Sequence, residues 1–209
     1  MKLSDIYPPF GLELRSGEFR LKPADDASLQ LMGEINHEDI FVDPNTPWVF
    51  PWSLTPKPLI ALETARFHWG LRAKNSPDDW QIPFIAFAQD KFIGSIDLRA
   101  TKFSETRTVE TGSYVLSKYQ NQGYGTAMRE LLATYCFDWL QASTMRSKWH
   151  PDNAASAQVS TKLGYTITGT DEEDGQSVVV AELAAENFCR IPIEVTGHTR
   201  ELEQFLGVN

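Results

Sequence analysis

Residues 114–125 read Tyr-Val-Leu-Ser-Lys-Tyr-Gln-Asn-Gln-Gly-Tyr-Gly, and this stretch decides the fold. It begins with β-forming residues, passes through a polar turn and reaches two glycines, Gly123 and Gly125. Apolar residues then recur at the spacing of one helix face, at Met128, Leu131, Leu132, Tyr135 and Trp139. The order of strand, glycine turn and helix start favours an anion-binding site, because the first amides of a helix are unpaired and carry partial positive charge.

Two common nucleotide-binding motifs are excluded by the residues around these glycines. A P-loop requires a Gly-Lys-Ser/Thr sequence, and no lysine follows Gly125; a Rossmann fingerprint requires a third glycine where Met128 stands. The stretch instead resembles the acetyl-CoA motif of the GNAT superfamily of N-acetyltransferases, Gln/Arg-x-x-Gly-x-Gly/Ala, and reads Gln120-Asn-Gln-Gly-Tyr-Gly125. Taken alone, this short motif leaves a plain glycine turn before an ordinary helix as the alternative.

A second motif follows in the expected order. Asn153-Ala-Ala-Ser156 opens a predicted helix with Asn153 as its N-cap, and Lys162-Leu-Gly-Tyr165 closes that helix with Gly164 after its last turn. The pair resembles the later GNAT motif in the branch that includes RimJ- and RimL-type enzymes. The resemblance covers about residues 18–184, most specifically 106–165. It implies an α+β fold with a mixed, mainly antiparallel sheet, a central splay between two strands, and helices packed on both faces.

Composition bounds the class of protein. The chain has 209 residues, of which 42% are hydrophobic and 22% charged, so we expect one globular domain over 1–209, with a core at 18–184 and a C-terminal extension at 185–209. A net charge of −9 argues against a nucleic-acid partner, which requires a basic face. No apolar run is long enough for a bilayer, and no secretion signal is evident. Cys136 and Cys189 lack metal-ligand spacing, and Cys136, within a predicted helix, is expected to be a buried thiol in a reducing compartment, so we expect the cytoplasm.

Periodicity and turn residues predict the order of elements. We expect strands at 18–22, 80–88, 91–98, 106–116, 144–149, 166–170 and 177–183. We expect helices beginning near residue 23 and over 59–73, 124–140, 154–163 and 200–206. Residues 1–17 are expected to be irregular, 37–58 to form a long aromatic loop, and 171–175 to form an acidic hairpin turn closed by Asp-Gly.

The resemblance implies which residues bind acetyl-CoA. The pantetheine arm is expected to pair with the backbone of Tyr114, Val115 and Leu116, and Asn153 to hydrogen-bond the arm unless it serves only as a helix cap. The pyrophosphate is expected on the turn and the helix start, at Gln120, Asn121, Gln122, Gly123, Tyr124, Gly125 and Thr126. No metal is expected, because main-chain donors meet the anion.

The transfer of acetyl to an amine requires a base, an oxyanion donor and help for the leaving thiol. Glu110 is the candidate base, since it shares a strand face with Gly112 and Tyr114 and matches a glutamate of RimJ/RimL-like sequences. His150 is the alternative base. A backbone N–H within 114–116 is expected to face the oxyanion. Many GNAT enzymes have a tyrosine acid where this chain has Ser160, so Ser156 is the candidate for contacting the sulfur.

The function predicted is acetyl-CoA-dependent N-acetylation of a primary amine, on a small molecule or a peptide N-terminus, by direct transfer in a ternary complex. Trp48 and Trp52 of the aromatic loop are the candidate acceptor-binding residues, because aromatic faces suit a cationic amine. Packing of the loop on the sheet is their alternative role. The alternative function is a non-catalytic acyl-CoA-binding module, which keeps the cofactor site but not the acid–base pair, and a third option is an interaction domain that uses the fold alone. No membrane partner is expected, and a homodimer is left open.

Overall fold

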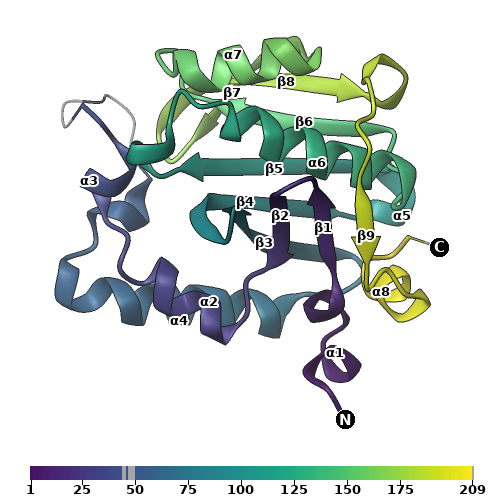
Figure 1. The fold of residues 1–209 in the computed structure, drawn as a ribbon. Helices are drawn as coiled ribbons and strands as arrows, with labels where there is room; N and C mark the ends of the chain where they lie inside the picture. Colours follow the sequence, from purple (N-terminus) through teal and green to yellow (C-terminus); the bar gives the residue numbers. More distant parts are fainter. Residues whose placement is uncertain (44–45, 47–49, 209) are drawn as a thin grey trace.

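One nine-stranded sheet forms the centre of the computed structural model, which describes residues 1–43, 46 and 50–208 (Figure 1). The strand order is β7-β8-β6-β5-β4-β3-β2-β1-β9, and among these described strands only the neighbours β5 and β6 are parallel. The strands are β1 (Glu13–Ser16), β2 (Phe19–Pro23), β3 (Asp79–Ala88), β4 (Lys91–Thr101), β5 (Thr108–Val115), β6 (Thr144–Trp149), β7 (Thr166–Glu173), β8 (Gln176–Ala184) and β9 (Glu194–Thr196). The α+β class and the mainly antiparallel sheet are confirmed.

Helices cover both faces of this sheet. The side chains of β3 alternate between two cores: Phe84 and Ala86 pack with α6, whereas Ile85 and Phe87 pack with Met32 of α2. The α-helices are α1 (Leu3–Ile6), α2 (Asp26–Met32), α3 (His37–Ile40), α4 (Lys57–Lys74), α5 (Phe103–Thr106), α6 (Tyr124–Asp138), α7 (Ala154–Leu163) and α8 (Arg200–Phe205). Short 3-10 turns are η1 (Pro8–Gly11), η2 (Pro51–Leu54), η3 (Ser117–Tyr119) and η4 (Ala185–Asn187).

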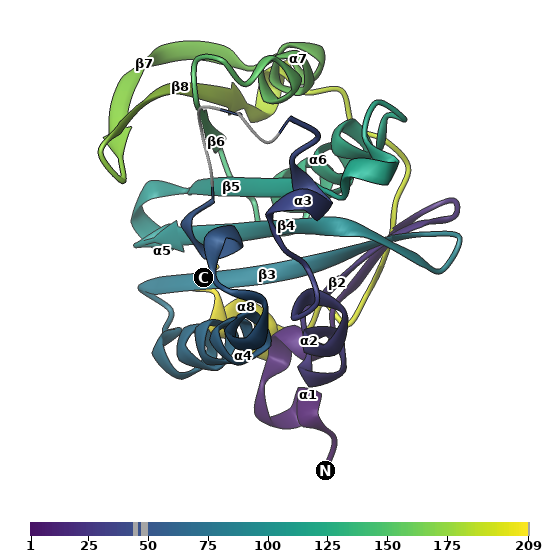
Figure 2. The same cartoon turned by 90° about the vertical axis from the view of Figure 1, so that its left-hand side faces the viewer.

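The central splay lies between β5 and β6. The two strands pair in parallel from Thr108–Thr144 to Thr111–Ser147, and the pairing stops there although both strands continue. Figure 2 shows β7 and β8 curving away above β5 and β4, while α4 and α2 lie below β3. The last residues of β5 therefore have one edge paired with β4 and the other edge unpaired.

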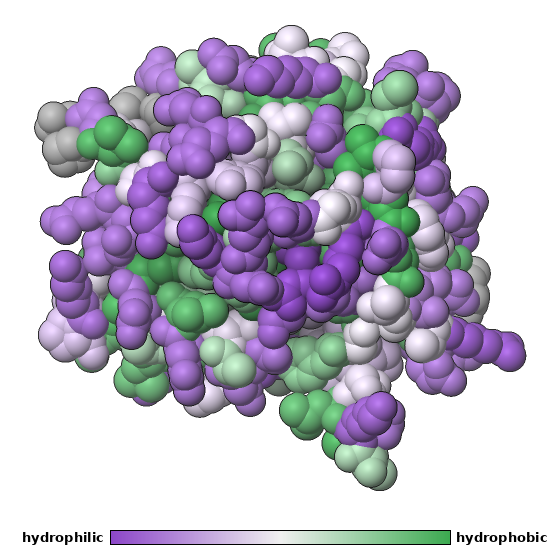
Figure 3. Space-filling view, in the orientation of Figure 1, coloured by the Kyte–Doolittle hydropathy of each residue, from purple (hydrophilic) through white to green (hydrophobic). Residues whose placement is uncertain are grey.

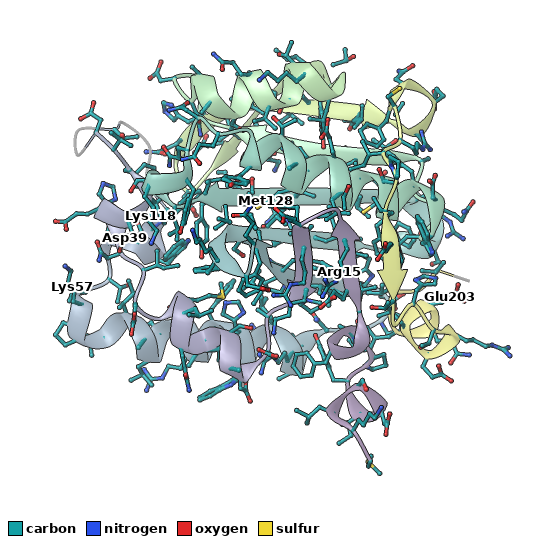
Figure 4. The ribbon with its side chains drawn as sticks, in the orientation of Figure 1. Arg15, Asp39, Lys57, Lys118, Met128 and Glu203 are labelled. Atoms are coloured by element: carbon teal, nitrogen blue, oxygen red, sulfur yellow. The ribbon has the colours of Figure 1, made fainter. Side chains whose placement is uncertain are left out.

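Helix α6 forms because one of its faces is almost wholly apolar. Met128, Leu131, Leu132 and Tyr135 are 0% exposed, as their spacing predicted, and Met128, labelled in Figure 4, lies in the first half of the helix. The helix begins after Gly123, whose φ of +85° suits glycine best. This burial fixes the start of α6 beside the end of β5, so the predicted order of strand, turn and helix is confirmed.

The two termini differ from the prediction. Residues 1–17, expected to be irregular, contain β1, and the region 185–209 contains β9, which pairs with β1 through Leu14–Val195. Neither strand is long enough for alternation to be read in the sequence. Each forms because its partner strand supplies the hydrogen bonds, and that partner is brought close only by the tertiary fold. The aromatic loop of 37–58 also holds two short helical turns, α3 and η2.

The acidic hairpin also differs in one respect. Asp171, Glu172 and Glu173 belong to β7, and the turn itself is only Asp174-Gly175, with φ values of +51° and +75°. All of β7 is exposed, so charged side chains suit this edge strand, where they discourage pairing with other chains. Across the described residues, no helix is both long and apolar enough to span a membrane. Figure 3 shows hydrophilic side chains over most of one face, with hydrophobic ones among them over α2 and α4.

Candidate functional site

The turn before α6 presents a set of uncapped amides. Asn121, Gln122 and Gly123 are exposed, and no described side chain caps the helix start. A Cβ at Gly123 would meet nothing within 4 Å, whereas a Cβ at Gly125 would lie 3.5 Å from Val159 and 3.8 Å from Val115. A side chain at Gly125 would therefore touch both β5 and α7. Unpaired amides, positive helix-end charge and open space together suit a pyrophosphate, so these residues fit acetyl-CoA.

The end of β5 offers the Val115 amide to the gap beside it. The Leu116 N–H donates to the Ile93 carbonyl at 2.9 Å, towards β4. Because successive amides of a strand point to opposite edges, Tyr114 shares that edge and the Val115 N–H points into the gap. The Val115 carbonyl accepts from Gln120 Nε2 at 2.9 Å, and the same nitrogen donates to the Ile40 carbonyl at 2.6 Å. The Gln120 side chain therefore fastens α3 to β5.

Asn153 caps α7. Its Oδ1 accepts from the Ser156 N–H at 3.1 Å, which is the capping role left open by the sequence. The side-chain NH2 still has two hydrogens to donate. Ser156 is half-buried in the first turn of α7. The proposed cofactor residues thus line both sides of the gap, with the turn and β5 on one side and the start of α7 on the other.

A cavity of about 480 Å³ lies between α4 and the sheet. It is lined by Met32, Phe50, Trp52, Thr55, Ile60, Glu63, Thr64, Phe67, His68, Gln81, Pro83, Ser95, Asp97, Gly112, Ser113 and Tyr114. This lining includes two carboxylates but no lysine or arginine. Trp52 is one of its walls, with its ring 5.5 Å from that of Tyr114. Trp48, the other tryptophan predicted to bind the acceptor, lies outside the described residues.

Asp97 is the acid that the sheet contributes to this cavity, and the sequence did not point to it. Its Oδ1 accepts from the Gly112 N–H at 3.1 Å, and its Oδ2 accepts from Gln81 Nε2 at 3.0 Å. Burial raises the pKa of Asp97 from an ordinary value near 3.8 to about 6, against the opposing effects of Arg99 and these hydrogen bonds. The available signal was an acid in the strand Lys91–Thr101, among Ile96, Leu98 and other buried residues.

Glu110 has a different environment. The β4–β5 register places Asp97 opposite Gly112 and Arg99 opposite Glu110, so both acids lie on the same face of the sheet. The Glu110 carboxylate bonds the Arg99 guanidinium, which also lies 3.6 Å from Glu173. Glu110 is not among the residues that line the cavity. Its role as base stays a prediction, with Asp97 as a second candidate closer to Tyr114.

Two histidines complete the set of candidate bases. His150 Nδ1 accepts from the Asp152 N–H at 3.2 Å, just after β6, and His150 does not line the cavity. His68 does line the cavity, and burial lowers its pKa to about 4, so it is neutral at pH 7. Within the described part of the chain, no group of His, Cys, Asp or Glu could hold a metal ion.

Comparison with known proteins identifies the family to which the chain belongs. A family model described as "Acetyltransferase (GNAT) domain" matches residues 20–166. The RimJ structure from Mycobacterium smegmatis, solved with CoA-disulfide, has a TM-score of 0.72 at 20% identity and covers 91% of this chain and 92% of its own. RimL, a ribosomal L7/L12 alpha-N-protein acetyltransferase solved with coenzyme A, has a TM-score of 0.63 at 17% identity, covering 81% and 95%. A chimera of spermidine N-acetyltransferase SpeG from Vibrio cholerae and hSSAT has a TM-score of 0.62 at 12% identity, covering 81% and 96%.

Proposed function

The chain belongs to the GNAT family of acetyl-CoA-dependent N-acetyltransferases, and on that premise we propose that its acceptor amine enters the cavity beneath α4 and loses a proton to Asp97. The observation that carries this proposal is the position of Asp97. Its carboxylate lies in the cavity, bonded to the backbone of Gly112, two residues before Tyr114. The acceptor side and the cofactor side of the fold thus meet at the end of β5.

Different residues are proposed to bind the cofactor, to stabilise the developing charge and to accept the proton. Acetyl-CoA supplies the activated acetyl thioester. The amides of residues 121–126 bind its pyrophosphate, and the Val115 N–H donates a hydrogen bond to the acyl oxygen, where negative charge develops. Asp97 Oδ accepts a proton from the acceptor ammonium, directly or through water. With a pKa of about 6, Asp97 is mostly ionised at pH 7 and remains a better base than an exposed aspartate.

The lining of the cavity supports one class of acceptor. Glu63 and Asp97 favour a cation, and no lysine or arginine of the lining opposes it. The remaining walls are mainly apolar, including Phe50, Trp52 and Phe67. We propose a primary amine on an apolar body, carried by a small molecule or by a peptide N-terminus. The RimL relative acts on a protein N-terminus and the SpeG relative on spermidine, so both acceptor forms occur among similar folds.

The experiment that tests the function is an acceptor screen with detection of free thiol. Amines with one charge and an apolar body, N-terminal dipeptides and polyamines are each supplied with acetyl-CoA. We expect thiol release with the first two groups and weak release with polyamines. The opposing reading, a non-catalytic acyl-CoA-binding module, predicts that acetyl-CoA raises the melting temperature while no amine releases thiol. That result would overturn the proposed transfer reaction.

The roles of Ser156, Asn153 and Glu110 stay proposals within this function. Ser156 is proposed to contact the sulfur, Asn153 to donate to the pantetheine arm, and Glu110 to be the base if Asp97 is not. A cytoplasmic location is also a proposal. It is supported by Cys136 and Cys189, which are both free thiols, as is usual in a reducing compartment.

A further inference from the structure

Arg129 of α6 is a buried cation without an acidic partner. The residue is only 4% exposed. Its Nη1 donates to Ser160 Oγ of α7 at 2.7 Å, and its guanidinium lies 5.6 Å from the ring centre of Tyr165. Its Nε has no hydrogen-bond partner. Among the described residues, no carboxylate pairs with it. A buried charge is costly unless an anion or hydrogen bonds compensate it, so this arginine requires an explanation.

Three unsatisfied hydroxyls surround the same region. Thr111 Oγ1, Ser147 Oγ and Tyr165 Oη are buried without a hydrogen-bond partner. Thr111 and Ser147 face each other as the last residues that pair β5 with β6 before the splay. Burial raises the pKa of Tyr165, whereas the charge of Arg129 and the nearby Thr111 hydroxyl both lower it, so Tyr165 lies close to both halves of the group. We call Arg129, Ser160, Tyr165, Thr111 and Ser147 the root cluster, because they lie where the gap begins.

The root cluster lies at the end of the path expected for the acyl arm. That path begins at the amides before α6, passes between Val115 and Val159, whose side chains flank Gly125, and follows the free edge of β5. Ser160 lies one helical turn after Ser156, on the same face of α7. An arm bound along β5 would therefore bring its sulfur towards Arg129, and its acyl group towards the cavity at Ser113 and Gly112.

We propose that Arg129 supplies the positive charge that stabilises the sulfur of acetyl-CoA as a thiolate, and that Ser160 holds the guanidinium in place. The inference rests on the proposed function. During transfer the acceptor nitrogen forms a bond to the acyl carbon, the carbon–sulfur bond breaks, and its electron pair stays on sulfur. The acceptor ammonium first gives one proton to Asp97, which passes it to solvent, and after the attack the nitrogen loses a second proton to the same carboxylate. A serine hydroxyl is too weak an acid to protonate the sulfur fully, so a fixed cation is the more effective partner.

The groups around Arg129 leave only the thiol to titrate in the mildly alkaline range. Burial raises the pKa of Tyr165 to about 12, and burial also raises the pKa of Cys136, which acts on Tyr165. Ser160 of α7, Thr111 of β5 and Ser147 of β6 do not titrate. Burial lowers the pKa of Arg129 itself, but a guanidinium remains protonated in proteins. A change in CoA binding between pH 7 and 9.5 would then report ionisation of its thiol.

The test compares CoA with S-methyl-CoA, which cannot ionise at sulfur, by calorimetric titration between pH 7 and 9.5. In the wild type we expect CoA to gain about tenfold in affinity over S-methyl-CoA as pH rises, equivalent to a thiol pKa lowered by about one unit. Arg129→Met, which is similar in length and uncharged, should abolish this gain. Arg129→Lys, the matched control, should retain part of it because it keeps the charge.

The outcomes separate this inference from the proposed function. If Arg129→Met keeps the wild-type gain, the proposal is overturned. If the wild type itself shows no gain while S-methyl-CoA binds well, the proposal also fails, and this result needs no variant to fold. If neither ligand binds at any pH, the proposed cofactor site is wrong, and both the proposed function and the role of Arg129 are overturned with it. A melting temperature of Arg129→Met near the wild-type value excludes a general loss of structure, and a neutral replacement of an unpaired buried charge is expected to be tolerated.

Discussion

At the scale of single residues, the environment of each carboxylate decides what it can do. Asp97 and Glu110 lie on the same face of neighbouring strands, two ladder pairs apart. Asp97 is bonded to neutral donors in a cavity, so its pKa is raised to about 6 by burial. Glu110 is bonded to the Arg99 guanidinium. A base must have a lone pair that is free to accept a proton, and this condition favours Asp97.

Asp97→Asn tests this assignment by activity. We expect turnover to fall by roughly 10²–10⁴, the usual contribution of a general base, with acetyl-CoA affinity nearly unchanged. Glu110→Gln is the matched variant and should keep most of the turnover. The measurement is steady-state kinetics with the best acceptor between pH 5 and 9. A large loss in Glu110→Gln together with a small one in Asp97→Asn would return the base to Glu110.

The same substitution predicts a gain in stability. The pKa of Asp97 is raised in the folded state, so the folded protein binds more protons than the unfolded chain between about pH 4 and 6. The wild type therefore loses stability as pH rises through this window. Asp97→Asn avoids that loss and should be more stable than the wild type at pH 7 by about 1–3 kcal/mol. Urea unfolding at pH 4 and pH 7 checks this, and an equal difference at both pH values would contradict it.

At the scale of elements, the turn between β5 and α6 presents main-chain amides rather than side chains to a ligand. Its amides remain unpaired because the helix start has no side-chain cap among the described residues and because Gly123 adopts φ +85°. A side chain at Gly123 would meet no neighbouring atom, so any effect of substitution comes from backbone strain or from what the side chain excludes. This allows strain and exclusion to be separated experimentally.

Gly123→Glu should abolish acetyl-CoA binding, because a carboxylate would occupy the position of the pyrophosphate. Gly123→Ala carries the same backbone strain, of about 1 kcal/mol, without the charge, and should retain most of the binding. In the wild type, acetyl-CoA at a hundredfold excess over Kd should stabilise the fold by about 2.7 kcal/mol. Thermal shifts of the three proteins provide the comparison. Similar shifts in all three would mean that the pyrophosphate binds elsewhere.

The segment η2 contributes an aromatic wall to the cavity that we propose for the acceptor. Trp52 lies 39% exposed, between Phe50 at 5.9 Å and Tyr114 at 5.5 Å, so it can contact an acceptor without being part of the main core. Trp52→Ala should raise the KM for the amine several-fold with little change in the KM for acetyl-CoA. The two KM values are measured together with the melting temperature. Parallel losses in all three would assign Trp52 a purely structural role.

At the scale of the whole molecule, the C-terminal residues are part of the core. Leu202 and Leu206 are 1% and 2% exposed, and the Trp80 indole donates to the Leu206 carbonyl at 2.9 Å. Arg107 donates to the Val208 carbonyl at 2.8 Å, and β9 extends the sheet beyond β1. Figure 4 shows Glu203 on α8, and its carboxylate lies 3.0 Å from His198, whose ring bonds the Tyr135 hydroxyl of α6. The region 185–209 therefore closes one end of the fold.

Leu202→Ala should accordingly lower the free energy of unfolding by about 2–5 kcal/mol, as for other fully buried leucines. Truncation after residue 184 should prevent cooperative folding, because it removes both leucines and the partner strand of β1. Circular dichroism melts of the two proteins check these expectations. A truncated chain that melts cooperatively and still binds acetyl-CoA would show that 18–184 is an independent core.

The sequence by itself determined the strand, glycine turn and helix around residues 114–138, because the periodicity of α6 and the φ of Gly123 are local properties. It also predicted the family through two motifs that are each contiguous in the chain. Only the tertiary structure decided the pairing of β1 with β9, the acid that faces the cavity, and the arginine partner of Glu110. These features depend on register between strands, which brings Asp97 to Gly112 and Arg99 to Glu110 across β4 and β5. Register depends on which side chains are buried and on the connection between the strands, and here the connection from β4 to β5 runs through α5, so neither strand by itself shows which residues face each other.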